Sequence, residues 1–99
     1  MNEWDLADAK ARLTSEQPNL QRAARVVEFL MTWADENSDG WMFWPGPGNA
    51  ARSLCDALER GANDEGGQDL PLTDLRKALR PVKAFCTRHH IAHPPYLTA

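Results

Sequence analysis

The segment of about residues 20–35 constrains the fold of this chain more than any other feature of the sequence. At about 100° per residue, one apolar stripe runs the length of this segment. Its members are Leu20, Ala23, Ala24, Val27, Leu30, Met31 and Ala34. Val26, Phe29 and Trp33 widen the stripe, so that only a narrow polar strip remains. A helix that is apolar over more than half its circumference packs on two sides at once, so the sequence predicts a central helix.

Two further segments with a helical pattern lie before and after the central one. The segment of about residues 3–13 has a ragged apolar stripe, and we expect a short surface helix in which Asp8 faces Arg12. Another segment begins near residue 48 and repeats small and apolar side chains with the helical period. We expect this helix to stop at Gly61, because glycine readily takes the left-handed conformation that ends many helices.

The last predicted helix covers about residues 74–89, and Thr73 is expected to cap its amino-terminal end. Pro81 falls on the polar side of this segment, where it should kink the helix. The apolar pattern keeps its phase across the proline, which favours one kinked helix over two. Pro94 and Pro95 should end the helix firmly, and we expect the last four residues of the chain to fray.

Length and composition predict one small domain. Ninety-nine residues are enough for a single core and too few for two. The hydrophobic share of 42% and the charged share of 25% are those of an ordinary globular protein. The predicted fold class is all-α, with a single helical domain over residues 1–99. About four helices would form a compact orthogonal or irregular bundle, with a short extended aromatic insertion at 41–47.

Cysteine content and hydropathy indicate the compartment in which the protein works. Cys55 and Cys86 are too few for the disulfide framework of a small secreted domain. No apolar run has the length of a signal peptide core or of a membrane span. We therefore expect a soluble, cytoplasmic protein with reduced thiols and no membrane partner.

The formal charge of −3 is distributed unevenly along the chain. Residues 1–75 hold six Lys or Arg and all fourteen carboxylates, whereas residues 76–99 hold five cations and no carboxylate. Four of these cations share one side of the last predicted helix, namely Arg76, Lys77, Arg80 and Lys83. Such a face can dock an acidic protein surface, contact nucleic acid phosphates through residues 76–88, or simply be solvated.

A run of four large apolar residues, 41–44, lies between glycine and proline residues. The run is too short for a helix, so we expect an extended strip. If all four side chains were buried, they would cover one end of the helices. If some protrude, Trp41, Phe43 and Trp44 would be rigid aromatic anchors of the kind that protein interfaces favour. A homodimer through the same strip is an alternative.

One cluster near the carboxyl-terminal end contains side chains that bind metals. Cys86, His90 and His93 would project to one side if the last helix continued that far, and cysteine and histidine are the usual ligands of zinc. Their spacing matches no well-defined zinc motif. We predict no metal there and keep a zinc site as an alternative.

The stretch that follows the central helix has the first half of a calcium-loop pattern. Asp35, Asn37, Asp39 and Gly40 occupy its positions 1, 3, 5 and 6. Gly46 occupies the twelfth position, where the motif needs a bidentate Glu. We therefore expect a polar loop that ends the helix rather than a calcium site.

No catalytic motif stands out, since the sequence has no nucleophile elbow and no Gly-rich phosphate loop. We expect no enzyme and no cofactor. The predicted function is that of a non-catalytic interaction protein, an adaptor, inhibitor or regulator that binds another protein, alone or within a macromolecular complex. The aromatic strip, the basic last helix or both would form the contact surface. The alternatives are a nucleic-acid-binding regulator that uses helix 74–89 and a zinc-binding protein that uses the Cys/His cluster.

Overall fold

A computed structural model of the chain describes residues 6–37, 47–63 and 68–97, and within these ranges it contains helices and no strand. The elements are α1 (Leu6–Arg12), α2 (Pro18–Asn37), α3 (Pro47–Asn63), α4 (Leu72–Arg88) and the 3-10 helix η2 (Pro95–Leu97). The all-α prediction is confirmed. None of the helices in the described ranges is both long and apolar enough to cross a membrane.

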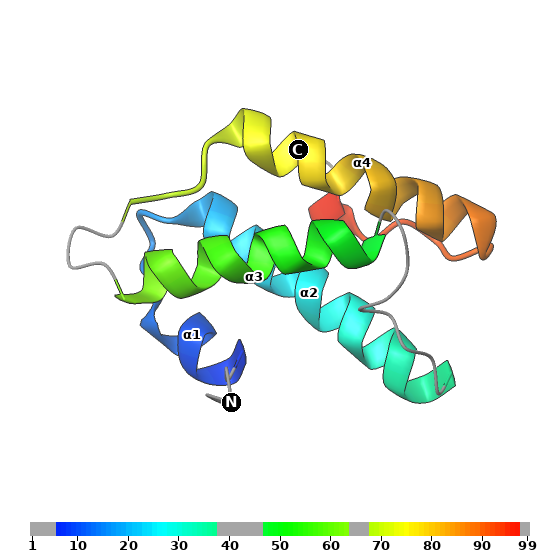
Figure 1. Cartoon of the computed structure of the whole chain (residues 1–99), viewed down its shortest axis with the longest axis horizontal. Coiled ribbons are helices and arrows are strands. Elements are labelled where there is room, and N and C mark those ends of the chain that lie inside the picture. The colour runs from blue at the N-terminus through cyan, green and yellow to red at the C-terminus, as the bar shows by residue number, and fades with distance from the viewer. Residues whose placement is uncertain (1–5, 38–46, 64–67, 98–99) are drawn as a thin grey trace.

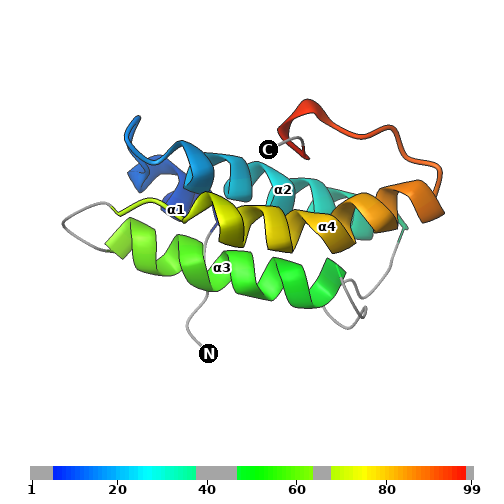
Figure 2. The same ribbon diagram turned by 90° about the horizontal axis from the view of Figure 1, so that it is seen from above.

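Three long helices form the body of the fold, with each one antiparallel to the next along the chain (Figures 1 and 2). α3 packs against both α2 and α4, and α1 lies against α2 and α3. After α4 the chain turns back, and η2 packs on α2 and α4. α2 contacts all four other elements, as expected of the central helix.

The core is built from the inward sides of the three long helices. α2 contributes the predicted stripe except for Met31, which is 36% exposed. The prediction for Met31 is wrong because the apolar arc of α2 is wider than its neighbours cover, and Val26 is completely buried instead. The polar strip of α2 is exposed as predicted. The remaining core residues of the long helices are Ala50, Ala51, Leu54, Ala57, Leu58, Leu75, Leu79, Val82, Phe85 and Cys86.

α1 is a short surface helix, as its ragged pattern predicts. Ala9 is its buried residue, and Leu6 and Leu13 pack partly against the core. The expected pair is present, with 3.2 Å between Asp8 Oδ2 and a terminal nitrogen of Arg12. Both side chains are more than half exposed, so this ion pair stabilises the fold only slightly.

Gly61 does not end α3, which continues to Asn63. Gly61 lies instead where α3 passes close to the start of α2. A Cβ atom at this position would overlap Cδ1 of Leu20, whose side chain is almost completely buried. The sequence prediction was wrong because this glycine serves the close approach of two helices and not a turn.

Both ends of α4 differ in detail from the prediction. The helix begins at Leu72, so Thr73 lies inside its first turn and does not cap it. Pro71 is the N-cap residue, and its carbonyl accepts hydrogen bonds from the backbone N–H groups of Asp74 and Leu75, each at 3.0 Å. The helix continues through Pro81 as one element, as predicted.

The carboxyl-terminal end of α4 is set by backbone geometry at His90 and not by Pro94 and Pro95. His90 has a left-handed φ of 58°, which is uncommon for a residue with a side chain. The N–H of Ile91 donates to Cys86 O at 2.8 Å, and that of His90 donates to Thr87 O at 3.3 Å. This pair of bonds is the Schellman pattern, with histidine where glycine is usual.

The chain does not fray immediately after the last prolines. Leu97 is completely buried and belongs to the core, and Tyr96 is half-buried against it. The prediction that the last four residues fray is therefore wrong for these two, while residues 98–99 lie outside the described ranges. The burial of one leucine holds η2 on α2 and α4.

Side-chain hydrogen bonds tie the segment before α4 to the start of α2. Asp69 Oδ1 accepts from Leu20 N at 2.9 Å, and Asp69 Oδ2 accepts from Asn19 N at 3.1 Å. Gln17 is 1% exposed, and its amide donates to the carbonyls of Gly61 and Gln68 at 3.2 and 3.3 Å. These bonds fix the position of the chain as it enters α4.

Candidate functional site

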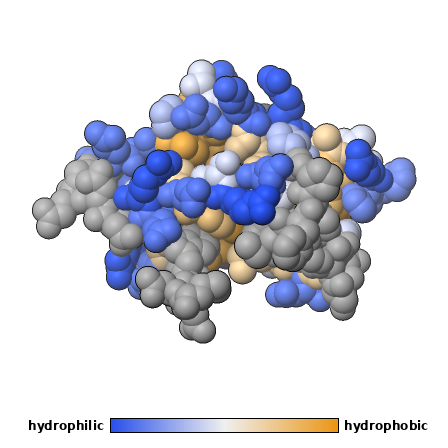
Figure 3. Space-filling model, viewed as in Figure 1, coloured by the Kyte–Doolittle hydropathy of each residue, from blue (hydrophilic) through white to orange (hydrophobic). Residues whose placement is uncertain are grey.

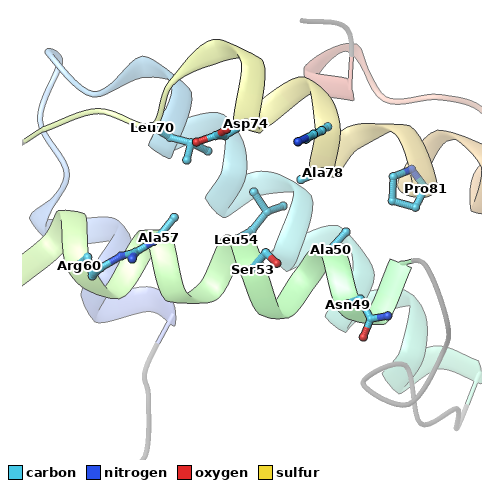
Figure 4. A pocket seen from close by; sticks show the side chains of 11 residues that line it. Asn49, Ala50, Ser53, Leu54, Ala57, Arg60, Leu70, Asp74, Ala78 and Pro81 are labelled. Carbon is cyan, nitrogen blue, oxygen red and sulfur yellow. The ribbon is translucent and has the colours of Figure 1, made fainter.

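A groove of about 520 Å³ runs between α3 and α4 (Figure 4). The α3 wall consists of Asn49, Ala50, Ser53, Leu54, Ala57 and Arg60. The opposite wall consists of Leu70, Asp74, Lys77, Ala78 and Pro81. In Figure 4, Leu54 and Ala57 point into the space that separates them from α4.

The groove exists because the facing positions of the two helices carry small side chains. Ala50 and Ala57 on α3 face Ala78 on α4, and alanine leaves space that a leucine would fill. Leu54, which is almost completely buried, forms part of the floor. A volume of this size falls within the range of about 300–1,000 Å³ that is usual for ligand sites.

Charged groups border this apolar floor. Arg60 and Lys77 supply two cations, and Asp74 supplies one carboxylate. The balance therefore favours an occupant with apolar side chains and an adjacent negative charge. Figure 3 shows the same side of the molecule, where apolar surface is visible beneath hydrophilic side chains.

The predicted basic face lies on α4, next to the groove. Arg76, Lys77 and Arg80 are exposed, and Lys83 is half-buried. None of these four cations forms an ion pair with a carboxylate of the described residues. Because Lys77 also lines the groove, the basic face and the groove form one continuous surface.

The predicted aromatic anchors cannot be placed on this surface. Trp41, Phe43 and Trp44 lie outside the described residues, as does the rest of the predicted insertion at 41–47 except Pro47, which is not extended but begins α3. The hypothesis that they contact a partner stays a prediction.

The residues considered for zinc and for calcium do not have the arrangement that either site would need. α4 ends at Arg88, so Cys86 is buried in the helix while His90 and His93 are exposed beyond it. Within the described ranges, no three His, Cys, Asp or Glu side chains are grouped closely enough to hold a metal ion. Asp35 and Asn37 belong to α2 and not to a loop, whereas Asp39 and Gly40 lie outside the described residues.

The two thiols are held in their protonated form. Burial, reinforced by Asp56 and Glu59, raises the pKa of Cys55 to about 11. Burial also raises the pKa of Cys86. A thiol with a raised pKa is a poor nucleophile and a poor metal ligand at neutral pH, because both roles need the thiolate.

Sequence reasoning missed a smaller pocket of about 290 Å³ between α2 and η2. Three aromatic side chains line it, Phe29, Trp33 and Tyr96, together with Glu28, Thr32 and Glu36. The one signal is the apolar pair Tyr96–Leu97 directly after two prolines, which indicates a segment held against the fold but not the helix that it contacts.

Comparison with known proteins adds no further assignment. No protein family, curated protein or solved structure matches this chain.

Proposed function

We propose that this protein is a non-catalytic interaction protein, an adaptor, inhibitor or regulator, that binds an acidic amphipathic helix of a partner protein. The helix would lie along the groove between α3 and α4, beside the basic face of α4. The observation that carries the proposal is the row of exposed cations without ion pairs among the described residues, continuous with an apolar groove.

An amphipathic helix is the occupant that best matches both parts of this surface. Its apolar side chains would fill the space above Leu54 and the facing alanines, and burial of this area would supply most of the affinity. Its carboxylates would meet Lys77, Arg80 and Arg60 at the rim. Rim charges of this kind contribute mainly to the rate and orientation of association.

A nucleic-acid-binding regulator is the second candidate, because the same cations suit phosphates. Residues 76–99 contain no carboxylate that would repel a polyanion. Two features favour a protein partner instead. The remaining chain carries eight more carboxylates than cations. The connection from α3 to α4, residues 64–71, is also longer than the three- or four-residue turn of a helix-turn-helix.

The test is a pull-down from host lysate with and without nuclease, comparing the wild type with a Lys77→Glu, Arg80→Glu double variant. The matched control is Arg12→Glu, Arg25→Glu, which makes the same change in net charge at exposed positions on α1 and α2, outside the groove. A protein that survives nuclease, is lost with the first variant and is kept with the control supports the proposal.

Three results would contradict it. Capture that disappears with nuclease would assign the basic face to nucleic acid. Capture that both double variants reduce equally would show a general charge effect with no preference for the groove. Capture that neither variant changes would place the contact elsewhere, and Trp44→Ala then tests the predicted aromatic strip.

A further inference from the structure

The pocket between α2 and η2 combines aromatic side chains with carboxylates. Phe29, Trp33 and Tyr96 line the cavity, and Glu28 and Glu36 lie on the exposed side of α2. The residues 28, 29, 32, 33 and 36 follow one another at helical spacing, so they share one side of α2. η2 supplies the tyrosine from the opposite wall.

The core holds the aromatic walls of this pocket in place. The ring of Trp33 meets that of Phe85 edge-on, with centroids 5.1 Å apart and planes at 87°. Tyr96 is held by its neighbour Leu97, which is completely buried. All three lining aromatic side chains are half-buried, so each has one part in the core and another part accessible. An aromatic site built in this way needs little reorganisation to bind a ligand.

Two of the residues that line the pocket, Glu28 and Glu36, carry carboxylates, which attract a cation. Glu28 forms an ion pair with Lys10, with 3.1 Å between Nζ and Oε2, and both side chains remain about half exposed. Glu36 forms no ion pair with any described residue. Burial raises the pKa of Tyr96, the nearby Glu28 raises it further, and Arg25 lowers it, so a carboxylate and a guanidinium both lie near this wall.

We propose that this pocket binds an alkylammonium group, the charged end of a lysine side chain or of its methylated forms. The faces of aromatic rings attract cations within about 6 Å, and adjacent carboxylates add Coulomb attraction. A cavity of about 290 Å³ is small for a drug-sized ligand but has room for a single side-chain end. Methylation lowers the cost of removing the ammonium from water, so methylated forms bind more tightly.

This inference concerns a different surface from the groove, and its ligand has the opposite charge. It stands even if the groove binds nothing. Binding could come from burial of apolar methyl groups or from recognition of the ammonium charge. The neutral carbon isostere of trimethyllysine separates these two explanations, because it has the same shape without the charge. An apolar pocket would accept both molecules, whereas an ammonium site discriminates between them.

The experiment is an NMR titration that follows the indole N–H signal of Trp33, identified by its loss in Trp33→Phe. Three probes are amino acids blocked at both ends of the backbone, as the Nα-acetyl derivative and the methylamide: trimethyllysine, lysine with its free side-chain ammonium, and the neutral isostere. The fourth probe is tetramethylammonium, the free cation. We expect a saturable shift with trimethyllysine and binding at least about fivefold tighter than for the isostere. If tetramethylammonium binds with the same affinity as trimethyllysine, the pocket recognises the head group. If tetramethylammonium binds more weakly than trimethyllysine, the pocket recognises the whole side chain.

Two variants test the residues of the pocket. Glu36→Gln keeps the shape of an exposed side chain and should weaken trimethyllysine binding about threefold. Tyr96→Leu should weaken it about tenfold. The control, Lys77→Gln with Arg80→Gln, changes the groove side and should leave the affinity unchanged. Equal binding of the isostere, or no shift of the Trp33 signal with any cation, would overturn the proposal.

Discussion

Replacement of Asp69 tests whether the segment before α4 is held by the end of another helix. The two carboxylate oxygens accept hydrogen bonds from the backbone of Asn19 and Leu20, in the first turn of α2. Asp69 thus caps a helix that lies about fifty positions earlier in the chain. Asp69→Ala removes both acceptors and leaves the backbone N–H groups of a half-buried helix end without a protein partner.

The expected cost follows from the two effects that the carboxylate supplies. Loss of a capping side chain costs about 0.5–2 kcal/mol. Loss of a negative charge at the positive end of a helix costs about 0.3–1 kcal/mol more. The free energy of unfolding should therefore fall by about 2 kcal/mol, and the Tm by about 10 °C for a chain of this size. Asp69→Asn keeps one acceptor oxygen, so its effect should be about half as large.

Urea and thermal unfolding, followed by far-UV circular dichroism, measure this loss. The matched control is Asp56→Ala on the exposed side of α3, which should change the free energy of unfolding by less than about 0.5 kcal/mol. If Asp69→Ala were as stable as the control variant, the capping argument would be refuted. Since Leu70 lines the groove, Asp69→Ala should also loosen one end of that site.

Three further predictions follow from particular contacts. Gly61→Ala should lower the free energy of unfolding by about 1 kcal/mol in urea titrations, because overlap with Leu20 outweighs the gain in helix propensity; a more stable variant would contradict the close approach. In the same titrations, His90→Gly should raise the free energy of unfolding by about 0.5 kcal/mol, because glycine removes the strain of the left-handed backbone at this position. His90→Val should lower the free energy of unfolding. Since the pKa of Cys55 is raised from 9.0 to about 11, folding favours the protonated thiol, so stability should fall as pH rises from about 9 through 11. Cys55→Ala should flatten that slope, and alkylation of Cys55 should be slow below pH 9.

The apolar periodicity was sufficient to predict the helices and most of the core. Each long helix buries most of the stripe that its spacing predicts, with Met31 exposed and Cys55 and Ala78 partly buried, because burial of one side is the main reason why these segments are helical. The phase of the pattern across Pro81 also predicted one continuous helix correctly. The basic side of α4 is exposed for the same reason, since its opposite side is needed for the core.

Local sequence rules failed at Gly61 and Tyr96, where a distant part of the chain decided the outcome, and at Thr73, where a neighbouring residue did. Gly61 resembles a helix stop, but Leu20 is the residue that requires a glycine there. Thr73 resembles a cap, yet the hydrogen bonds of Pro71 start the helix two residues earlier. The aromatic pocket depends on the return of Tyr96 to α2. The sequence around Tyr96 does not identify the helix that this residue contacts, so the pocket was not predicted.

The two proposed sites differ in how far they can be altered without disturbing the fold. Lys77 and Arg80 are exposed, and other positions of α4 supply the core, so charge reversal there should change binding and leave stability almost unaffected. Trp33 lines the pocket and also contacts Phe85, so its removal acts on binding and stability together. Glu36 is exposed, and Glu36→Gln therefore reports on ammonium binding alone. Weaker trimethyllysine binding in that variant, with unchanged unfolding and unchanged partner capture, would establish the pocket as a site separate from the groove.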